Sequence, residues 1–254
     1  MRLRLATLLC PLLLASTNSS PGENAGPRPE VEALLEQADA AYARRDQPGA
    51  LEELRAKLEE ASRLSPDNYE VLWREARMEF WMADDPSIPT KERSRLGKLA
   101  WEHGDRATQI DPDRVEGWNF AASGVGNYAL GIGLLRAMGE GIEAKFKERL
   151  ARAEKIDPDF ESGAIQTAWG RFWFRLPWPK YDAKKSERAL KVALEKNPDN
   201  VRARVYLSDV YAKEGHKDRA REELERALQD PPGRYDAPEE RRMQQAARTR
   251  LDKL

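Results

Sequence analysis

The sequence has very few of the side chains that build thiol and zinc chemistry. Its 254 residues include one cysteine, Cys10, and two histidines, His103 and His216. Cys10 lies in a segment that we expect to be removed, which would leave no thiol for a disulfide, a metal site or a nucleophile. The two histidines lie far apart in the sequence, and neither belongs to a His-x-x-x-His zinc pattern. We expect no metal and no cofactor.

An excess of charge of one sign is also missing. The chain has 43 basic and 44 acidic residues, so its formal net charge is −1. A protein that binds nucleic acid usually has an excess of basic residues, so we expect no nucleic-acid partner here. The two signs alternate instead, as in 52–60, where opposite charges three and four residues apart stabilise exposed helices by roughly 0.2 to 0.5 kcal/mol per pair.

No catalytic arrangement of residues is evident. The glycine-rich stretches 124–126 and 131–133 are not followed by Gly-Lys-Ser or Gly-Lys-Thr, as a phosphate-binding loop would be. Acidic residues are abundant, but carboxylates on solvated helices carry no information about acid or base catalysis. We therefore expect a protein that is not an enzyme.

Long apolar runs are absent, and the apolar segment 5–15 is about half the length that spans a bilayer. It follows a basic start and precedes a small, polar stretch, so residues 1–20 are predicted to be a secretory signal peptide, cleaved between Ala15 and Ser20. Residues 21–28 are expected to form a disordered linker. Cys10 is a poor lipid-attachment site because Leu9 precedes it where a small residue is needed. An exported chain without cysteine fits a Gram-negative periplasm, with a membrane role limited to tethering.

Proline-containing turns recur along the rest of the chain. Five such prolines are spaced 46, 46, 40 and 34 residues apart: Pro66, Pro112, Pro158, Pro198 and Pro232. A proline cannot continue the helix before it, and in the first four turns the next residue is an Asp that we expect to cap the following helix. Each turn is therefore predicted to end one helical hairpin and begin another.

A small residue recurs with the same spacing as the prolines. An alanine lies five residues before each proline: Ala61, Ala107, Ala153, Ala193 and Ala227. The unit 201–232 is the most regular, and it resembles the tetratricopeptide repeat (TPR) through Leu207, Ser208, Tyr211, Ala220, Leu224, Ala227 and Pro232. Arg204 and Ser208 replace the usual Trp and Gly. The resemblance implies an all-α fold of hairpin repeats forming a right-handed solenoid.

This pattern predicts a single helical-repeat domain over residues 29–254. Its five helix pairs are expected at 29–64, 68–110, 114–156, 160–196 and 200–229, with extra residues at 45–49, 84–90, 131–141 and 176–182. A last helix from Pro238 to Leu254 is expected to cap the open end of the stack.

One segment, 120–135, has no charged residue in a chain that is 34% charged. Its four glycines each cost a helix about 1 kcal/mol relative to alanine, which indicates that another helix or a ligand approaches closely there.

The seven tryptophans all lie between Trp73 and Trp178. Two interpretations are open: they pack between adjacent hairpins, or they line a cavity. In the second, a groove between the third and fourth units binds a ligand or partner through aromatic area and two orienting amides. The residues expected to line it are Trp118, Asn119, Asn127, Tyr128, Trp169, Trp173 and Trp178.

From about Val71 onward the chain resembles the periplasmic T component of tripartite (TRAP-type) transporters, a family of helical repeat proteins. The resemblance rests on 118–128, 150–158, 163–165, 169–172 and 176–179. Similar segments occur in mitochondrial microtubule-associated helical repeat proteins, which indicates a wider superfamily. The resemblance to the T component implies a lipid-anchored protein that binds a small hydrophobic ligand and a solute-binding partner protein. The sequence around Cys10 departs from the lipid-attachment pattern of that family.

Together these features predict a non-catalytic periplasmic binding protein that holds a small hydrophobic ligand, a protein partner, or both. The alternative is a scaffold that recognises an extended peptide or an envelope-assembly protein on its concave surface. A sealed aromatic cavity would favour the first function, and a broad polar groove the second.

Overall fold

The computed structural model describes residues 29–229 and 231–254, and this part of the chain contains only helices, turns and loops. The predicted signal peptide at 1–20 and linker at 21–28 lie outside the described residues and stay predictions. Twelve α-helices and one 3-10 helix follow each other in the described part: α1 (Pro29–Tyr42), α2 (Ala50–Leu64), α3 (Tyr69–Ala83), α4 (Thr90–Ile110), α5 (Val115–Ile132), α6 (Leu134–Gly139), α7 (Ile142–Ile156), η1 (Phe160–Ser162), α8 (Ala164–Arg175), α9 (Ala183–Lys196), α10 (Val201–Lys213), α11 (Lys217–Gln229) and α12 (Ala237–Leu251).

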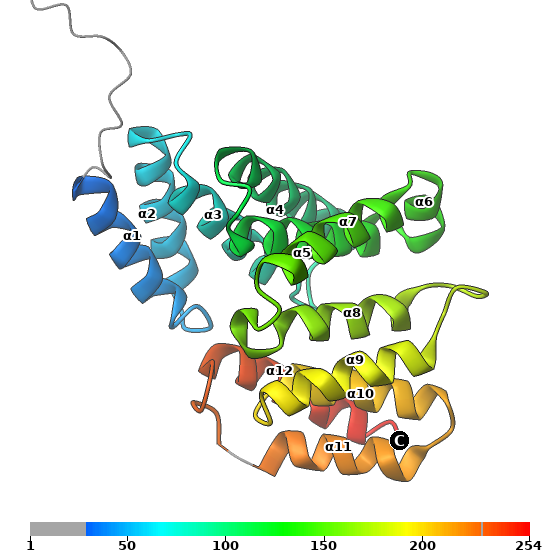
Figure 1. The fold of residues 1–254 in the computed structure, drawn as a ribbon. Helices are drawn as coiled ribbons and strands as arrows, with labels where there is room; N and C mark the ends of the chain where they lie inside the picture. Colours follow the sequence, from blue (N-terminus) through cyan, green and yellow to red (C-terminus); the bar gives the residue numbers. More distant parts are fainter. Residues whose placement is uncertain (1–28, 230) are drawn as a thin grey trace, which may run out of the picture.

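The helices form a solenoid of TPR type, as the sequence predicts (Figure 1). The five hairpins are α1/α2, α3/α4, α5/α7, α8/α9 and α10/α11, and α12 packs on the last of them. The extra residues predicted at 131–141 form the short helix α6, which is bounded by Gly133 and Gly141, with φ angles of 91° and 67°. Positive φ angles are accessible to glycine at little steric cost, so α6 is set apart from α5 and α7 by two glycine turns.

The proline turns are built differently from the expected Asp caps. The side chain of Asp111 accepts a hydrogen bond from the backbone N–H of Asp113, and Asn197 does the same for Asp199. The helix cap then falls one residue later, where Asn68 and Asn200 accept backbone hydrogen bonds. The prediction that the Asp after proline caps the next helix is therefore wrong, because the polar residue before proline holds that Asp in the turn.

The repeated alanines mark where each hairpin closes. All five are at most 2% exposed: Ala61, Ala107, Ala153, Ala193 and Ala227. The carbonyls of the first four also accept the backbone hydrogen bond that ends their helices. A larger side chain at this position would separate neighbouring helices, so the period seen in the sequence is a packing period.

The uncharged segment, 120–135, lies mostly in α5, and α5 crosses α4 at very short range. A Cβ atom placed on Gly124 of α5 would lie 2.8 Å from the carbonyl carbon of Ala100 in α4. One placed on Gly104 of α4 would lie 2.6 Å from the backbone nitrogen of Ala121. A Cβ on Gly131 would likewise lie 2.6 Å from the Cα of Ser94 in α4, whereas nothing lies within 4 Å of one on Gly133. The approach of another helix, one of the two causes that the sequence left open, therefore explains Gly124 and Gly131.

We expect Gly124→Ala to destabilise the protein by about 2 kcal/mol, because the overpacking cost outweighs the gain in helix propensity. Urea unfolding measures the change in free energy. Gly139→Ala is the matched control, since nothing lies within 4 Å of a Cβ at Gly139 and its effect should be close to zero. Equal stabilities of the two variants would contradict the close crossing of α4 and α5.

Candidate functional site

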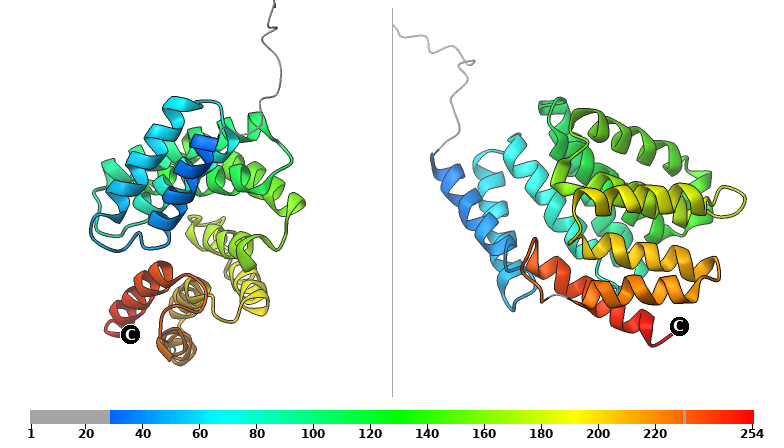
Figure 2. Two further views of the ribbon diagram at one scale, coloured as in Figure 1. Left: turned by 90° about the vertical axis from the view of Figure 1, so that its left-hand side faces the viewer. Right: turned by 60° about the horizontal axis from the view of Figure 1, so that its bottom comes forward.

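The solenoid curls until its last helix meets its first hairpin. Figure 2 shows the beginning of α12 beside the loop that joins α1 to α2. Arg241 of α12 forms an ion pair with Asp46 of that loop. Arg242 of α12 donates a 2.8 Å hydrogen bond to the backbone carbonyl of Trp81 at the end of α3. These interactions join residues that are up to 195 positions apart in the chain.

Arg45 is the most deeply buried of the groups that connect the two ends. It is 4% exposed, and its guanidinium lies 4.0 Å from the ring centroid of Tyr42 and 4.1 Å from that of Trp81. It forms a 2.6 Å ion pair with Asp236, the N-cap residue of α12. Two aromatic faces and one carboxylate therefore stabilise a cation that would otherwise be costly to bury.

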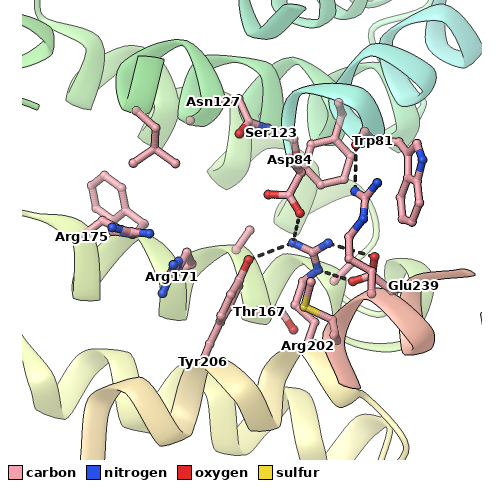
Figure 3. A pocket seen from close by; sticks show the side chains of 18 of the residues that line it. Trp81, Asp84, Ser123, Asn127, Thr167, Arg171, Arg175, Arg202, Tyr206 and Glu239 are labelled. Carbon is pink, nitrogen blue, oxygen red and sulfur yellow. Dashed lines mark hydrogen bonds and ion pairs between the residues drawn. The ribbon is translucent and has the colours of Figure 1, made fainter. Parts of the chain in front are cut away.

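Arg202 of α10 makes the second connection (Figure 3). Its guanidinium pairs with Asp84 at the end of α3 at 2.7 Å and also with Glu239 of α12. Burial opposes the charge on Arg202, but the two carboxylates outweigh that effect and raise the pKa of its guanidinium. Together with the pairs at Arg45, Arg241 and Arg242, these interactions are called the closing contacts below.

Behind the closing contacts lies a cavity of about 910 Å³, lined by residues from all five hairpins and from α12. Polar residues of the closing contacts form one side of it, with Trp81 and Glu239, and Arg175 lies on the other side (Figure 3). The lining also includes a set of apolar side chains, mainly from α5, α6, α7 and α8: Leu130, Leu134, Ala137, Met138, Ile142, Phe146, Phe172, Leu176 and Pro177. The cavity thus joins a charged part to an apolar part.

Arg175 is the cation next to the apolar part. Within the described residues no carboxylate pairs with it, whereas Arg171, one turn earlier in α8, pairs with Asp209 at 2.9 Å. Partial burial and the neighbouring Arg171 lower the pKa of Arg175 to about 10, although the residue is exposed to water in the open cavity, which screens part of this effect. This value leaves the guanidinium charged at neutral pH and without a counter-ion, so it is available to an anionic or polar group in the cavity.

Glu161 lines the cavity from an unusual turn. Its φ is 44° and that of Ser162 is 49°, both in the left-handed region that residues with a Cβ rarely adopt. Burial raises the pKa of Glu161 to about 7. The positive charge of Arg77 lowers this pKa in part, and the negative charge of Asp236 raises it further. Its side chain is nevertheless exposed to water in the open cavity, which screens part of this shift until the cavity is filled.

Asn119 and Asn127, both predicted to lie in a binding groove, are in the cavity wall. Each is 4% exposed. Neither side-chain amide has a hydrogen-bond partner among the residues that the structure describes. Because polar groups in a cavity wall fix the orientation of a bound molecule, these two amides are candidate contacts for a ligand.

The five aromatic residues predicted with them lie outside the cavity wall. Trp118 donates to the carbonyl of Pro112, and the hydroxyl of Tyr128 donates to Glu140. The rings of Trp169 and Trp173 stack with their centroids 6.3 Å apart, and Trp169 also packs edge-on against Phe146. Trp178 is 88% exposed on the loop between α8 and α9.

These aromatic side chains therefore do not gather with the two asparagines around one groove. Trp169 fits the other interpretation, since it packs against a hydrophobic cluster that includes Phe146 and Ile165.

Sequence reasoning did not identify Arg45, Glu161, Arg175 or Arg202. In a chain that is 34% charged, nothing local distinguishes these four from the arginines and glutamates of solvated helices. Their position depends on the curl of the whole solenoid.

Metal-binding and membrane-spanning features are both missing from the described ranges, 29–229 and 231–254. No cluster of three or more His, Cys, Asp or Glu residues there could hold a metal ion. No helix in the same ranges combines the length and the apolar character needed to cross a bilayer.

The sequence matches one family model, described as regulator of microtubule dynamics protein 1-3 (RMD1-3), over residues 34–254. Of the two resemblances stated above, this match supports the one to microtubule-associated helical repeat proteins. No curated protein sequence matches the chain.

Solved structures with a similar fold include the following two, one of which is a TPR protein. TTC0263, a thermophilic TPR protein of Thermus thermophilus, has a TM-score of 0.66 at 19% identity, covering 87% of this chain and 98% of its own. The pilF protein of Pseudomonas aeruginosa has a TM-score of 0.54 at 14% identity, covering 88% of this chain and 91% of its own. At these identities the similarity establishes the fold alone.

Glu161→Gln should weaken the pH dependence of stability. The folded chain keeps the Glu161 proton up to about pH 7 and the unfolded chain only to about pH 4.5, so stability falls as the pH rises between these values. Urea unfolding at about pH 5 and about pH 8 should show a smaller fall in the variant.

The raised pKa of His103 acts in the same direction, but it is present in both chains and cancels in the comparison. Glu36→Gln, on the exposed face of α1, serves as the control and should behave like the unmodified protein. An unchanged pH dependence in Glu161→Gln would show that Glu161 is fully hydrated in the empty cavity.

Proposed function

This chain belongs to the regulator of microtubule dynamics protein 1-3 family, and we propose that it is a non-catalytic binding protein that holds an elongated, mostly apolar small molecule in the cavity behind the closing contacts. The observation that carries the proposal is the cavity itself, in which an apolar wall adjoins polar groups without partners.

The size of the cavity supports this function. Its volume of about 910 Å³ lies toward the upper end of the roughly 300 to 1,000 Å³ that is common for small-molecule sites. The apolar residues of α5 to α8 offer a surface for a hydrocarbon-like part of the ligand. Burial of such a part would supply most of the affinity, at about 25 cal/mol per Å² of apolar surface removed from water.

The unpaired polar groups support a ligand with one polar or anionic end. Arg175 offers a cation beside the apolar wall, and the amides of Asn119 and Asn127 offer hydrogen bonds. A few polar contacts of this kind set the orientation of a ligand in a mainly apolar site. The ligand is therefore proposed to be amphipathic, with its polar group in reach of Arg175.

A protein partner is the second part of the proposed function. From the transporter resemblance, this partner would be the solute-binding protein of a TRAP-type system, which would exchange the ligand with the cavity. The proposal includes export to the periplasm, supported by the signal-peptide pattern of residues 1–20.

Mass spectrometry of the protein purified from its own envelope tests export. We expect a chain whose first residue lies between Ala15 and Ser20, and a chain that still begins with Met1 would contradict export.

The competing function is a scaffold for envelope assembly that binds an extended peptide on the concave surface. The TPR-type fold is compatible with it. The closing contacts favour the small-molecule function instead, because Arg45, Arg202 and α12 occupy the part of the concave surface along which a peptide would run.

The test fills the cavity with a protein side chain. Ser123 of α5 is partly exposed in the cavity wall (Figure 3), and Ser123→Trp places an indole in the ligand's space. Native mass spectrometry of the protein purified from its own organism should show a small molecule on the unmodified protein. We expect the occupied fraction to fall about tenfold or more in the variant, since overpacking and ligand exclusion both oppose binding.

Ala56→Trp, on the exposed face of α2, is the matched control and should retain the ligand. Circular dichroism and thermal unfolding establish that both variants keep the fold. If the unmodified protein carries no small molecule but copurifies with envelope-assembly proteins, the scaffold function replaces this one.

A further inference from the structure

Two large apolar side chains project into solvent from neighbouring parts of the molecule. Trp178, on the loop between α8 and α9, is 88% exposed, and Leu135 of α6 is 81% exposed. Single exposed apolar residues are common on soluble proteins. These two are the most exposed large apolar residues in the described part of the chain; the next, Tyr235, is 51% exposed.

Both residues adjoin the apolar part of the cavity. Leu134 and Met138, which flank Leu135 in sequence, line the cavity, as do Leu176 and Pro177 just before Trp178. An ion pair between Lys180 and Glu143 links the α8–α9 loop to the start of α7. The two segments 134–147 and 176–185 lie on the same side of the solenoid, and they are called the rim below (Figure 1).

The rim is basic, whereas the whole chain has a net charge of −1. It carries six basic residues, Arg136, Lys145, Lys147, Lys180, Lys184 and Lys185, and three acidic ones, Glu140, Glu143 and Asp182. The difference, six minus three, is a net charge of +3. Lys184 has no ion-pair partner among the described residues.

We propose that the rim is a docking surface for a lipid bilayer that contains anionic lipids, with Trp178 and Leu135 inserted among the headgroups. Tryptophan favours the boundary between water and hydrocarbon because its ring is apolar and its N–H is polar. Basic side chains around such residues add attraction to anionic lipids.

A bilayer fits these features better than a protein partner does. Trp178 and Leu135 project outward as two separate points and do not line a groove, so a partner protein would need a matching pocket for each. A bilayer accepts both at once and is complementary to the surrounding positive charge. Docking would bring the apolar part of the cavity to the lipid surface, but it does not require that the cavity hold a ligand.

The experiment uses the full chain and vesicles made of equal parts of phosphatidylglycerol and a phosphatidylcholine that is brominated on its acyl chains. Bromine quenches a nearby indole, and all seven tryptophans lie between Trp73 and Trp178, so the segment before them contributes no indole to the signal. We expect vesicles to quench part of the fluorescence. Trp178→Phe should remove most of this quenching, which identifies the reporting residue.

Leu135→Ser keeps Trp178 as the reporter and should weaken vesicle binding about tenfold, because burial of a leucine side chain is lost. Ile110→Ser is the matched control, since Ile110 is 44% exposed at the end of α4 and should not affect binding. Lys184→Glu, or vesicles of phosphatidylcholine alone, should also weaken binding several-fold.

Three results would overturn the proposal: no quenching by the vesicles, equal binding by Leu135→Ser and Ile110→Ser, or a concentration-dependent dimer that Leu135→Ser abolishes. The last would identify a second copy as the occupant of the rim. Each of these results leaves the cavity-filling test at Ser123 unaffected, so failure of docking and failure of ligand binding are distinguishable.

Discussion

Contact between the two ends of the solenoid is the interaction on which the rest of the structure depends. In a repeat protein each unit packs on its neighbours, and the two ends are usually free of each other. Here Arg45 reaches Asp236 and Arg202 bridges Asp84 and Glu239, so α12 is held against the first hairpin. These long side chains hold the two ends of the curved solenoid together, and the cavity lies behind them. Because each pair is partly withdrawn from water, removal of one partner leaves a poorly solvated charge, which makes the arrangement sensitive to single substitutions.

The cavity takes its two-part character from this closure. On the closed side, arginines and carboxylates neutralise each other, and little charge remains for a ligand. On the other side, α5 to α8 supply apolar side chains, with Arg175, Asn119 and Asn127 as unpaired polar groups. The basic rim with Trp178 and Leu135 adjoins this same side. The proposed ligand site and the proposed docking surface therefore share one side of the solenoid, the side that the closing contacts leave free.

The fold could be predicted from the sequence because its determinants are local and periodic. Prolines, the alanines five residues before them and the glycines of 120–135 each act through neighbours along the chain or in the adjacent hairpin. The site could be predicted only in part. Of the residues predicted to share a groove, Asn119 and Asn127 lie in the cavity wall, whereas Trp169 packs against a hydrophobic cluster, because a large aromatic residue at helical spacing suits either position. Arg45 and Asp236 are 191 positions apart, and no local pattern relates them.

The most direct test of the central claim is a distance measurement between the two ends of the solenoid. Spin labels at Gln47, in the α1–α2 loop, and at Arg248, on the exposed face of α12, can be placed in a chain whose Cys10 is replaced by Ser. Pulsed electron paramagnetic resonance should give one narrow distance distribution. The distribution should become long and broad when Arg45 and Arg202 are both changed to Ala. A narrow distribution that is unchanged by those substitutions would contradict the account, since the closure would then not depend on these ion pairs.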